Sequence, residues 1–103
     1  MSREYDKLVR DEIPHIIRES GESPRTHVAE GEELDRRLAE KVVEEAREFE
    51  ASHRIEELAD IVAVIDAVLV REEVDWETLR ELVSEKAAER GGFEDGVVLE
   101  RVE

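Results

Sequence analysis

The chain has 103 residues, the size of one small domain, and 44% of them are charged while only 4% are aromatic. Asp and Glu number 30 against 15 Lys and Arg, so the formal net charge is −15. This composition excludes a large multidomain machine and favours helices with an aliphatic core over a β-sandwich. It also argues against a nucleic-acid polymer as partner, because an acidic surface repels a phosphate backbone.

The sequence shows no export or membrane signal. It contains no cysteine, which excludes disulfides, thiolate metal sites and a cysteine nucleophile. Residues 1–7 lack the apolar stretch of a secretory signal. The longest apolar run, residues 61–70, is interrupted by Asp66 and is about half of the ~20 residues that a membrane-spanning helix requires. We therefore expect a cytoplasmic protein without a membrane partner.

The first half of the chain contains one short and one long predicted helix. Asp11 is placed to cap a helix over residues 11–20, because Pro14 is tolerated in a first turn and Gly21 is a favourable stop. From residue 32 to residue 51 apolar side chains recur at helical spacing. They form one stripe, which consists of Leu34, Leu38, Val42, Ala46 and Phe49.

The second half contains two further predicted helices. After a break at residues 52–53, residues 54–72 are apolar on nearly every side, which is typical of a helix buried from several directions. Asp75 is a favourable N-cap for a helix over residues 76–90, and the glycine pair that follows is a favourable stop. The tail from residue 93 is predicted to be extended.

These elements predict an all-α fold. We expect a single domain over residues 1–103, built as a helical bundle of about four helices with a central helical hairpin. One short chain has too little surface of its own to cover a helix that is apolar all round. We therefore expect self-association to complete the bundle.

Acidic residues interrupt the apolar faces of the two central helices. On a helical projection Glu45 falls inside the stripe of residues 32–51 and Glu48 falls on its edge. A charged carboxylate on a buried face is destabilising unless it is paired or neutralised. Glu57 and Asp60 likewise share one side of the next helix with apolar residues. These four carboxylates are the candidate site.

An antiparallel hairpin would bring the four carboxylates together. With its turn at residues 52–53, Glu45 stands opposite Asp60, and Glu48 stands opposite Glu57. Like charges at close range need a counter-charge, and a divalent cation is the simplest one. Oxygen ligands without Cys favour Mg²⁺ or Mn²⁺ over Zn²⁺, and Mg²⁺ in such sites recruits phosphates of a substrate. The pattern predicts a metal-assisted phosphate site.

The same residues resemble a known family. Glu44-Glu45-x-x-Glu48 followed by Glu57-x-x-Asp60 resembles the paired motif of the MazG-like and phosphoribosyl-ATP pyrophosphohydrolase-like proteins, which are all-α nucleotide pyrophosphohydrolases. The blocks at residues 5–14, YDKLVRDEIP, and at residues 89–93, ERGGF, agree with this family as well.

The resemblance implies an oligomeric helical bundle that cleaves nucleoside triphosphates to a monophosphate and pyrophosphate with Mg²⁺, or with Mn²⁺ in its place. It implies a house-cleaning role towards unwanted nucleotides. Carried over, the metal ligands are Glu45, Glu48, Glu57 and Asp60, and either Glu45 or Glu48 orients the attacking water. The basic residues inside the matching blocks are candidates for binding the triphosphate, namely Lys7, Arg10, Lys86 and Arg90.

Other interpretations of these residues remain open. Ala63 stands where the resemblance leads us to expect another Glu, which fits a non-catalytic dimerisation or adaptor protein that keeps the fold. A Glu-rich chain also forms such motifs by chance on solvated faces. The basic residues could equally be paired with surface acids. Glu50-x-x-His53 matches the ligand spacing of a di-iron bundle, although His53 is predicted to lie in the turn.

Overall fold

The computed structural model describes residues 3–103. Met1 and Ser2, the first residues of the segment in which we find no secretory signal, lie outside the described residues. The chain divides into two compact units, one ending at Val68 and the other running from Leu69 to Glu103. Each unit is described by itself, and the expectation of one domain over residues 1–103 stays a prediction.

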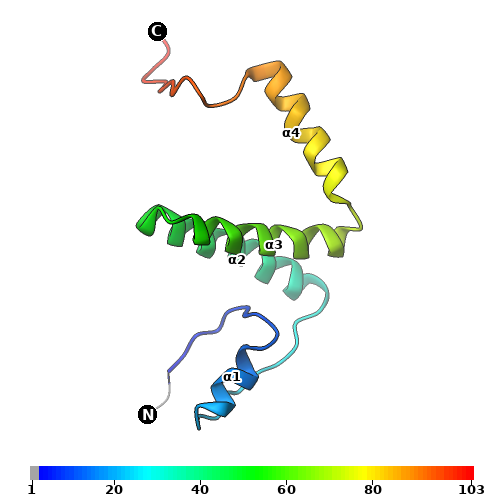
Figure 1. The fold of residues 1–103 in the computed structure, drawn as a ribbon. Coiled ribbons are helices and arrows are strands. Elements are labelled where there is room, and N and C mark those ends of the chain that lie inside the picture. The colour runs from blue at the N-terminus through cyan, green and yellow to red at the C-terminus, as the bar shows by residue number, and fades with distance from the viewer. Residues whose placement is uncertain (1–2) are drawn as a thin grey trace. The chain divides into compact units, whose positions relative to one another are not determined.

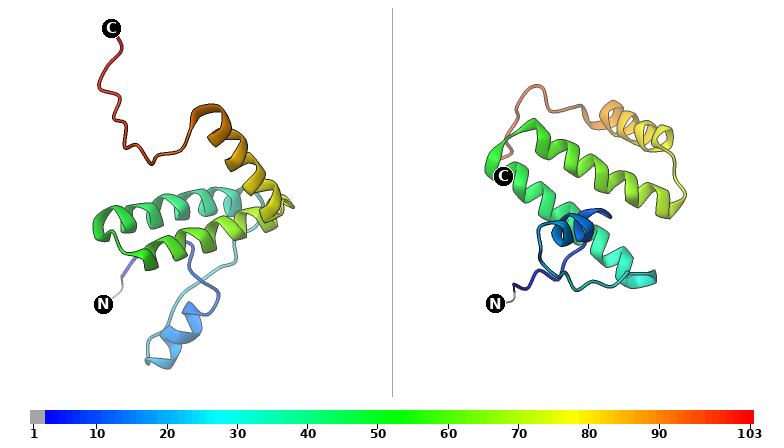
Figure 2. Two further views of the ribbon diagram at one scale, coloured as in Figure 1. Left: turned by 45° about the horizontal axis from the view of Figure 1, so that its top comes forward. Right: turned by 60° about the horizontal axis from the view of Figure 1, so that its bottom comes forward.

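Within residues 3–103 the fold is all-helical, with four helices and no strand, so the predicted all-α class is confirmed. α2 (Gly31–Ser52) and α3 (Ile55–Glu72) pack against each other as an antiparallel hairpin (Figures 1 and 2). None of the helices in this range combines the length and apolarity that a membrane crossing needs.

The turn of the hairpin is tight. His53 ends α2 in the left-handed conformation, with φ of 58°, and its N–H donates to the carbonyl of Phe49 at 2.7 Å. The ring of His53 stacks on Phe49 with centroids 6.0 Å apart. The predicted break between the two helices is therefore confirmed one residue later than expected, because Ser52 still belongs to α2 and residues 53–54 separate the helices. It sets the register between the two helices.

The N-terminal helix differs from its prediction at both ends. α1 spans Ile13–Glu19, and its N-cap is Glu12 rather than Asp11. The residues before it form a turn, in which the N–H of Ile13 donates to the carbonyl of Arg10 at 3.1 Å. That turn takes up the residues that we assigned to the first turn of the helix. Figure 1 shows α1 and the segment before it on one side of the hairpin.

The second unit contains the last turn of α3, α4 (Trp76–Arg90) and the tail. The predicted cap of α4 is confirmed, because the Asp75 side chain accepts a hydrogen bond from the Thr78 N–H at 2.8 Å. α4 ends at Gly91, whose φ is 82°. The tail from residue 93 to residue 103 holds no helix or strand.

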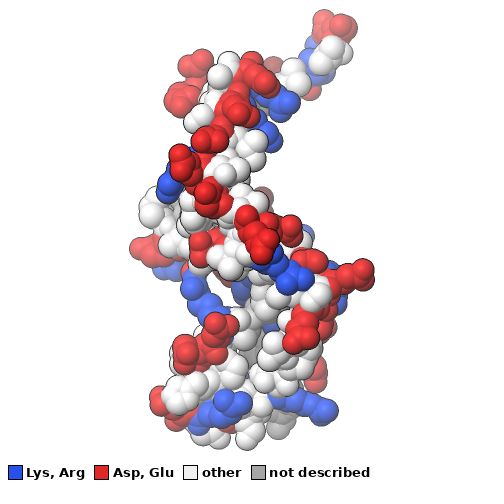
Figure 3. Space-filling model, turned by 90° about the vertical axis from the view of Figure 1, so that its right-hand side faces the viewer, with Lys and Arg blue, Asp and Glu red and all other residues white. Residues whose placement is uncertain are grey.

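Burial in a single chain is sparse. Among residues 3–103 the buried hydrophobic residues are Leu38 on α2 and Leu69 on α3, with 6% and 8% of their surface exposed. The expectation that α3 is buried from several directions is therefore not met by one chain. Val62, for example, is 50% exposed. Acidic side chains predominate over basic ones on the face shown in Figure 3, as the composition leads one to expect.

Candidate metal site on the helical hairpin

Three of the four predicted carboxylates come together on the first unit. Glu45 of α2 and Glu57 and Asp60 of α3 each offer one oxygen, and these three oxygens all lie within 4.8 Å of one another. The side chains of Glu45 and Glu57 are 14% and 13% exposed, so both are shielded from bulk water. The hairpin register thus brings the two central helices together at the level of their acidic residues.

The sequence explains this meeting. Glu57 lies in the first turn of α3, and Asp60 follows three residues later on the same face. Glu45 lies on the face of α2 that also carries Leu38, the buried residue of that helix. Because the helices run antiparallel from a short turn, residues before and after the turn reach the same level.

Glu48 is not one of the three. Its residue is exposed, whereas Glu45 is half-buried. This agrees with the helical projection, which puts Glu45 inside the apolar stripe and Glu48 on its edge. The role of Glu48 as a metal ligand or water-orienting group stays a prediction.

Basic side chains already lie against these carboxylates. Lys41 reaches Glu45 at 3.3 Å, one turn along α2. Arg54, just before α3, reaches Glu57 at 3.4 Å. The chain's own lysine and arginine side chains thus supply positive charge at the cluster, and the divalent cation stays a prediction.

Asp60 is paired with a residue from a distant part of the chain. Arg10 donates from Nη2 to Asp60 Oδ1 at 2.8 Å, across 50 residues of sequence. Lys7 lies on the same segment and donates to Glu44 at 2.9 Å. Two predicted phosphate-binding residues thus lie at the acidic face of the hairpin, in ion pairs with its carboxylates.

Glu44 and Lys41 form an ion pair at this face, 2.5 Å apart. Burial alone would lower the pKa of Lys41, but its hydrogen bonds and charge interactions with Glu44 and Glu45 outweigh burial and raise it. Burial would likewise raise the pKa of Glu44, but Lys41 and Lys7 outweigh burial and lower it. Both groups are therefore held in their charged forms.

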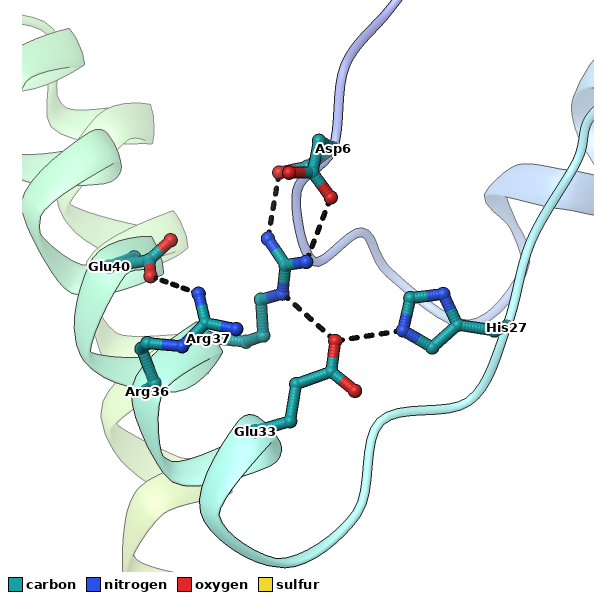
Figure 4. A network of polar contacts seen from close by, with 6 residues as sticks. All are labelled: Asp6, His27, Glu33, Arg36, Arg37 and Glu40. Atoms are coloured by element: carbon teal, nitrogen blue, oxygen red, sulfur yellow. Dashed lines mark hydrogen bonds and ion pairs between the residues drawn. The ribbon is translucent and has the colours of Figure 1, made fainter.

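A polar network fixes the segment before Lys7 to α2 (Figure 4). Arg37 donates from Nη1 to the backbone carbonyl of Asp6 and from Nη2 to its carboxylate, both at 2.8 Å. Its Nε donates to Glu33 at 3.3 Å, and Glu33 also pairs with His27 at 2.8 Å. The hydrogen bond with Asp6 is the largest cause that raises the pKa of Arg37. The network joins two chain segments to one helix.

The remaining predicted residues lie elsewhere. Lys86 and Arg90 are exposed on α4, in the second unit, and their contact with phosphate stays a prediction. His53 lies in the turn, as expected, with its ring on Phe49. The exposed Glu50, its partner in the di-iron motif, is not one of the three clustered carboxylates.

The three carboxylates suit a hard divalent cation in the type of donor atom and in the spacing of their oxygens. Oxygens on opposite sides of one Mg²⁺ lie about 4.2 Å apart, because each Mg²⁺–oxygen distance is about 2.1 Å. The three carboxylate oxygens lie within 4.8 Å of one another, which is close to this span. Sulfur and imidazole are missing from the group, so its chemistry suits Mg²⁺ or Mn²⁺.

Sequence reasoning missed Lys41, Arg54 and Arg37. The signal for Lys41 was present, because it precedes Glu45 by four residues and so lies on the same helical face. Arg54 likewise precedes Glu57 by three residues. The contact of Arg37 with Asp6 spans 31 residues and leaves no periodic trace in the sequence.

Comparison with protein-family models, with curated proteins and with solved structures finds no match to this chain. The family resemblance therefore stays a prediction from the motifs.

Proposed function

We propose that this protein is a Mg²⁺-dependent nucleoside triphosphate pyrophosphohydrolase of house-cleaning type. The observation that carries the proposal is the meeting of Glu45, Glu57 and Asp60 from two helices with their oxygens within 4.8 Å of one another. These are three of the four residues that the family motif implies as metal ligands. Mn²⁺ is the natural substitute cation, because it accepts the same oxygen ligands.

The chain's own residues divide the chemistry between them. Glu45, Glu57 and Asp60 would hold the cation, which would supply charge neutralisation for the phosphates and acidify a bound water. Glu45, or Glu48 at the edge of the site, would accept a hydrogen bond from the attacking water and direct it at the α-phosphorus. Monophosphate and pyrophosphate are the products.

The basic residues near the site complete the charge balance with a triphosphate. Lys7 and Arg10 already lie at the acidic face, so a change of side-chain rotamer would turn them from carboxylate to phosphate. Lys86 and Arg90 are proposed as further phosphate contacts on the strength of the sequence motif alone.

A second candidate function is a non-catalytic dimerisation or adaptor protein. The observation that favours it is the set of ion pairs at the site, since Lys41, Arg54 and Arg10 each contact one of the three clustered carboxylates. In that case the acidic cluster is a structural ion-pair network and needs no metal. Ala63 in place of a further Glu points the same way.

We also propose that the protein self-associates in the cytoplasm. The support is the exposure of apolar residues on both helices of the hairpin, among them Val43, Leu58 and Val62. A second copy of the chain would bury such residues at about 25 cal/mol for each Å² of apolar surface removed from water. Light scattering at micromolar concentration and high salt should show a dimer or larger; a monomer would contradict this part of the proposal.

The enzyme and the adaptor are separated by a screen of common and damaged nucleoside triphosphates with Mg²⁺ and with Mn²⁺. The enzyme releases pyrophosphate and no orthophosphate. In ¹⁸O-labelled water the label enters the monophosphate, because water attacks the α-phosphorus. Label in the pyrophosphate would mean attack at the β-phosphorus, and no turnover with either cation would favour the adaptor.

A further inference from the structure

The N-terminal segment before α1 is attached to the hairpin by charge. We define residues 6–10 as the strap. Asp6 is held by Arg37, Lys7 by Glu44 and Arg10 by Asp60, with shortest distances of 2.8, 2.9 and 2.8 Å. The strap between these pairs carries Leu8 and Val9, which are half-buried. The strap therefore crosses the acidic face of the hairpin.

Arg10, the last residue of the strap, forms an ion pair with a proposed metal ligand, Asp60. The carboxylate of Asp60 belongs to the three-residue group and also accepts the hydrogen bond of Arg10. A divalent cation at this carboxylate would stand beside the Arg10 guanidinium and compete with it for the negative charge of Asp60. Repulsion between the guanidinium and the cation weakens the pair.

We propose that Arg10 is a built-in counter-ion which a divalent cation displaces from Asp60, so that metal binding loosens the strap and frees Arg10 for an anionic ligand. This inference rests on the proposed metal site and concerns its regulation. The strap holds the site in a charge-compensated state, and the exchange couples cation binding to the position of the N-terminal segment.

The solvent exposure of the side chains differs between the ion pairs at the two ends of the strap. The side chains of Arg10 and Asp60 are 63% and 41% exposed, and ion pairs of this kind hold weakly. Arg37 is 11% exposed and makes two hydrogen bonds to Asp6, whose own side chain is 81% exposed. The strap is therefore anchored at its Asp6 end and exchangeable at its Arg10 end.

The first test compares Mn²⁺ affinity in three full-length proteins by electron paramagnetic resonance. Arg10→Gln removes the competing charge and should bind Mn²⁺ about two- to fivefold more tightly than the wild type, the range expected for loss of an exposed ion pair. Arg36→Gln is the matched control, because Arg36 makes an exposed ion pair with Glu40 at the same distance of 2.8 Å. The control should bind like the wild type.

The second test reads the release itself. Trypsin must take an arginine side chain into its specificity pocket, so the bond after Arg10 is protected while that side chain is paired. Saturating Mg²⁺ should speed cleavage after Arg10 relative to cleavage after Arg25, which lies in the exposed loop before α2. Mass spectrometry of the fragments gives this ratio.

The outcomes separate the two proposals. A wild type that binds Mn²⁺, with an unchanged cleavage ratio or with Arg10→Gln no tighter than the control, overturns the strap exchange and leaves the proposed function standing. A wild type and Arg10→Gln variant that both fail to bind Mn²⁺ overturn the metal site and the exchange together. Failure of the wild type alone, with binding restored in Arg10→Gln, supports the exchange in its strongest form.

Discussion

Each of the two units of the chain has its own kind of internal contact. In the first unit, ion pairs join residues 31, 37 and 50 positions apart and tie the N-terminal segment to the hairpin. In the second unit, the cap of α4 and the stacking of Arg80 on Trp76 act over three or four positions. α4 has no buried residue. The difference teaches that long-range contacts attach the N-terminal segment to the hairpin, whereas the signals that shape α4 act within a few residues.

The largest expected effect falls on the carboxylates. Glu45→Gln should lower turnover of the best nucleotide by about 10²–10⁴-fold, the usual contribution of a general base or positioning group. Glu48→Gln is the comparison, because Glu48 lies outside the three-residue group. Steady-state kinetics with Mg²⁺ checks both variants. A loss confined to Glu48→Gln would place the water-orienting group at the edge of the site.

The next largest effect is a loss of stability when a residue of the small hydrophobic core is truncated. Leu38→Ala should destabilise the protein by about 2–5 kcal/mol, because it empties a buried position on α2. Leu82→Ala on α4, at a position that is 48% exposed, should cost about 0.5 kcal/mol or less in an isolated chain. Urea unfolding monitored by circular dichroism measures both. A large cost at Leu82 would show that this face of α4 is covered in solution.

A smaller effect concerns the anchor of the strap. Arg37→Gln removes both bonds to Asp6. Trypsin cleavage after Lys7 should then rise by roughly two- to fivefold, since the remaining pairs of the strap are exposed and weak. Arg36→Gln again serves as the control on the neighbouring position. Equal cleavage in the two variants would show that the strap is held by its apolar residues instead.

The smallest effect is a pH dependence in the second unit. The hydrogen bond from Thr78 lowers the pKa of Asp75. A carboxyl with a lower pKa in the folded state stabilises above its unfolded pKa, and this contribution disappears as the pH falls below about 4. Asp75→Ala should therefore lower the melting temperature at pH 7 more than at pH 3. The difference in melting temperature between Asp75→Asn, which keeps an acceptor without the charge, and Asp75→Ala should not change with pH.

The local elements of the fold could be predicted from the sequence. The expected helix over residues 32–51 is α2 to within one residue at each end, and α4 has the predicted bounds. Both follow from signals that act within a few residues, namely apolar periodicity, the Asp75 cap and the glycine stop. The predicted bounds of α1 are less accurate, because the turn ahead of this helix depends on a backbone hydrogen bond from Ile13 to Arg10.

The candidate site could be predicted only in part. The antiparallel register correctly predicts that Glu45, Glu57 and Asp60 lie close together, because one short turn fixes the alignment of the two helices. Register gives the level of a side chain but not the direction in which it points, so the exposed Glu48 was included. The strap could not be predicted, since a pair such as Arg10 with Asp60 leaves no trace in local spacing.

The central claim is that the hairpin carboxylates bind a divalent cation, and neighbouring glutamates on α3 test it most directly. Glu57 belongs to the three-residue group, while Glu56, in the same first turn, is exposed and outside it. Mn²⁺ titration should show at least a roughly tenfold loss of affinity in Glu57→Gln, because the loss of even a group that only supports a metal ligand typically costs about 10–100-fold. Glu56→Gln should bind like the wild type. Equal Mn²⁺ affinity in the two variants would contradict the account.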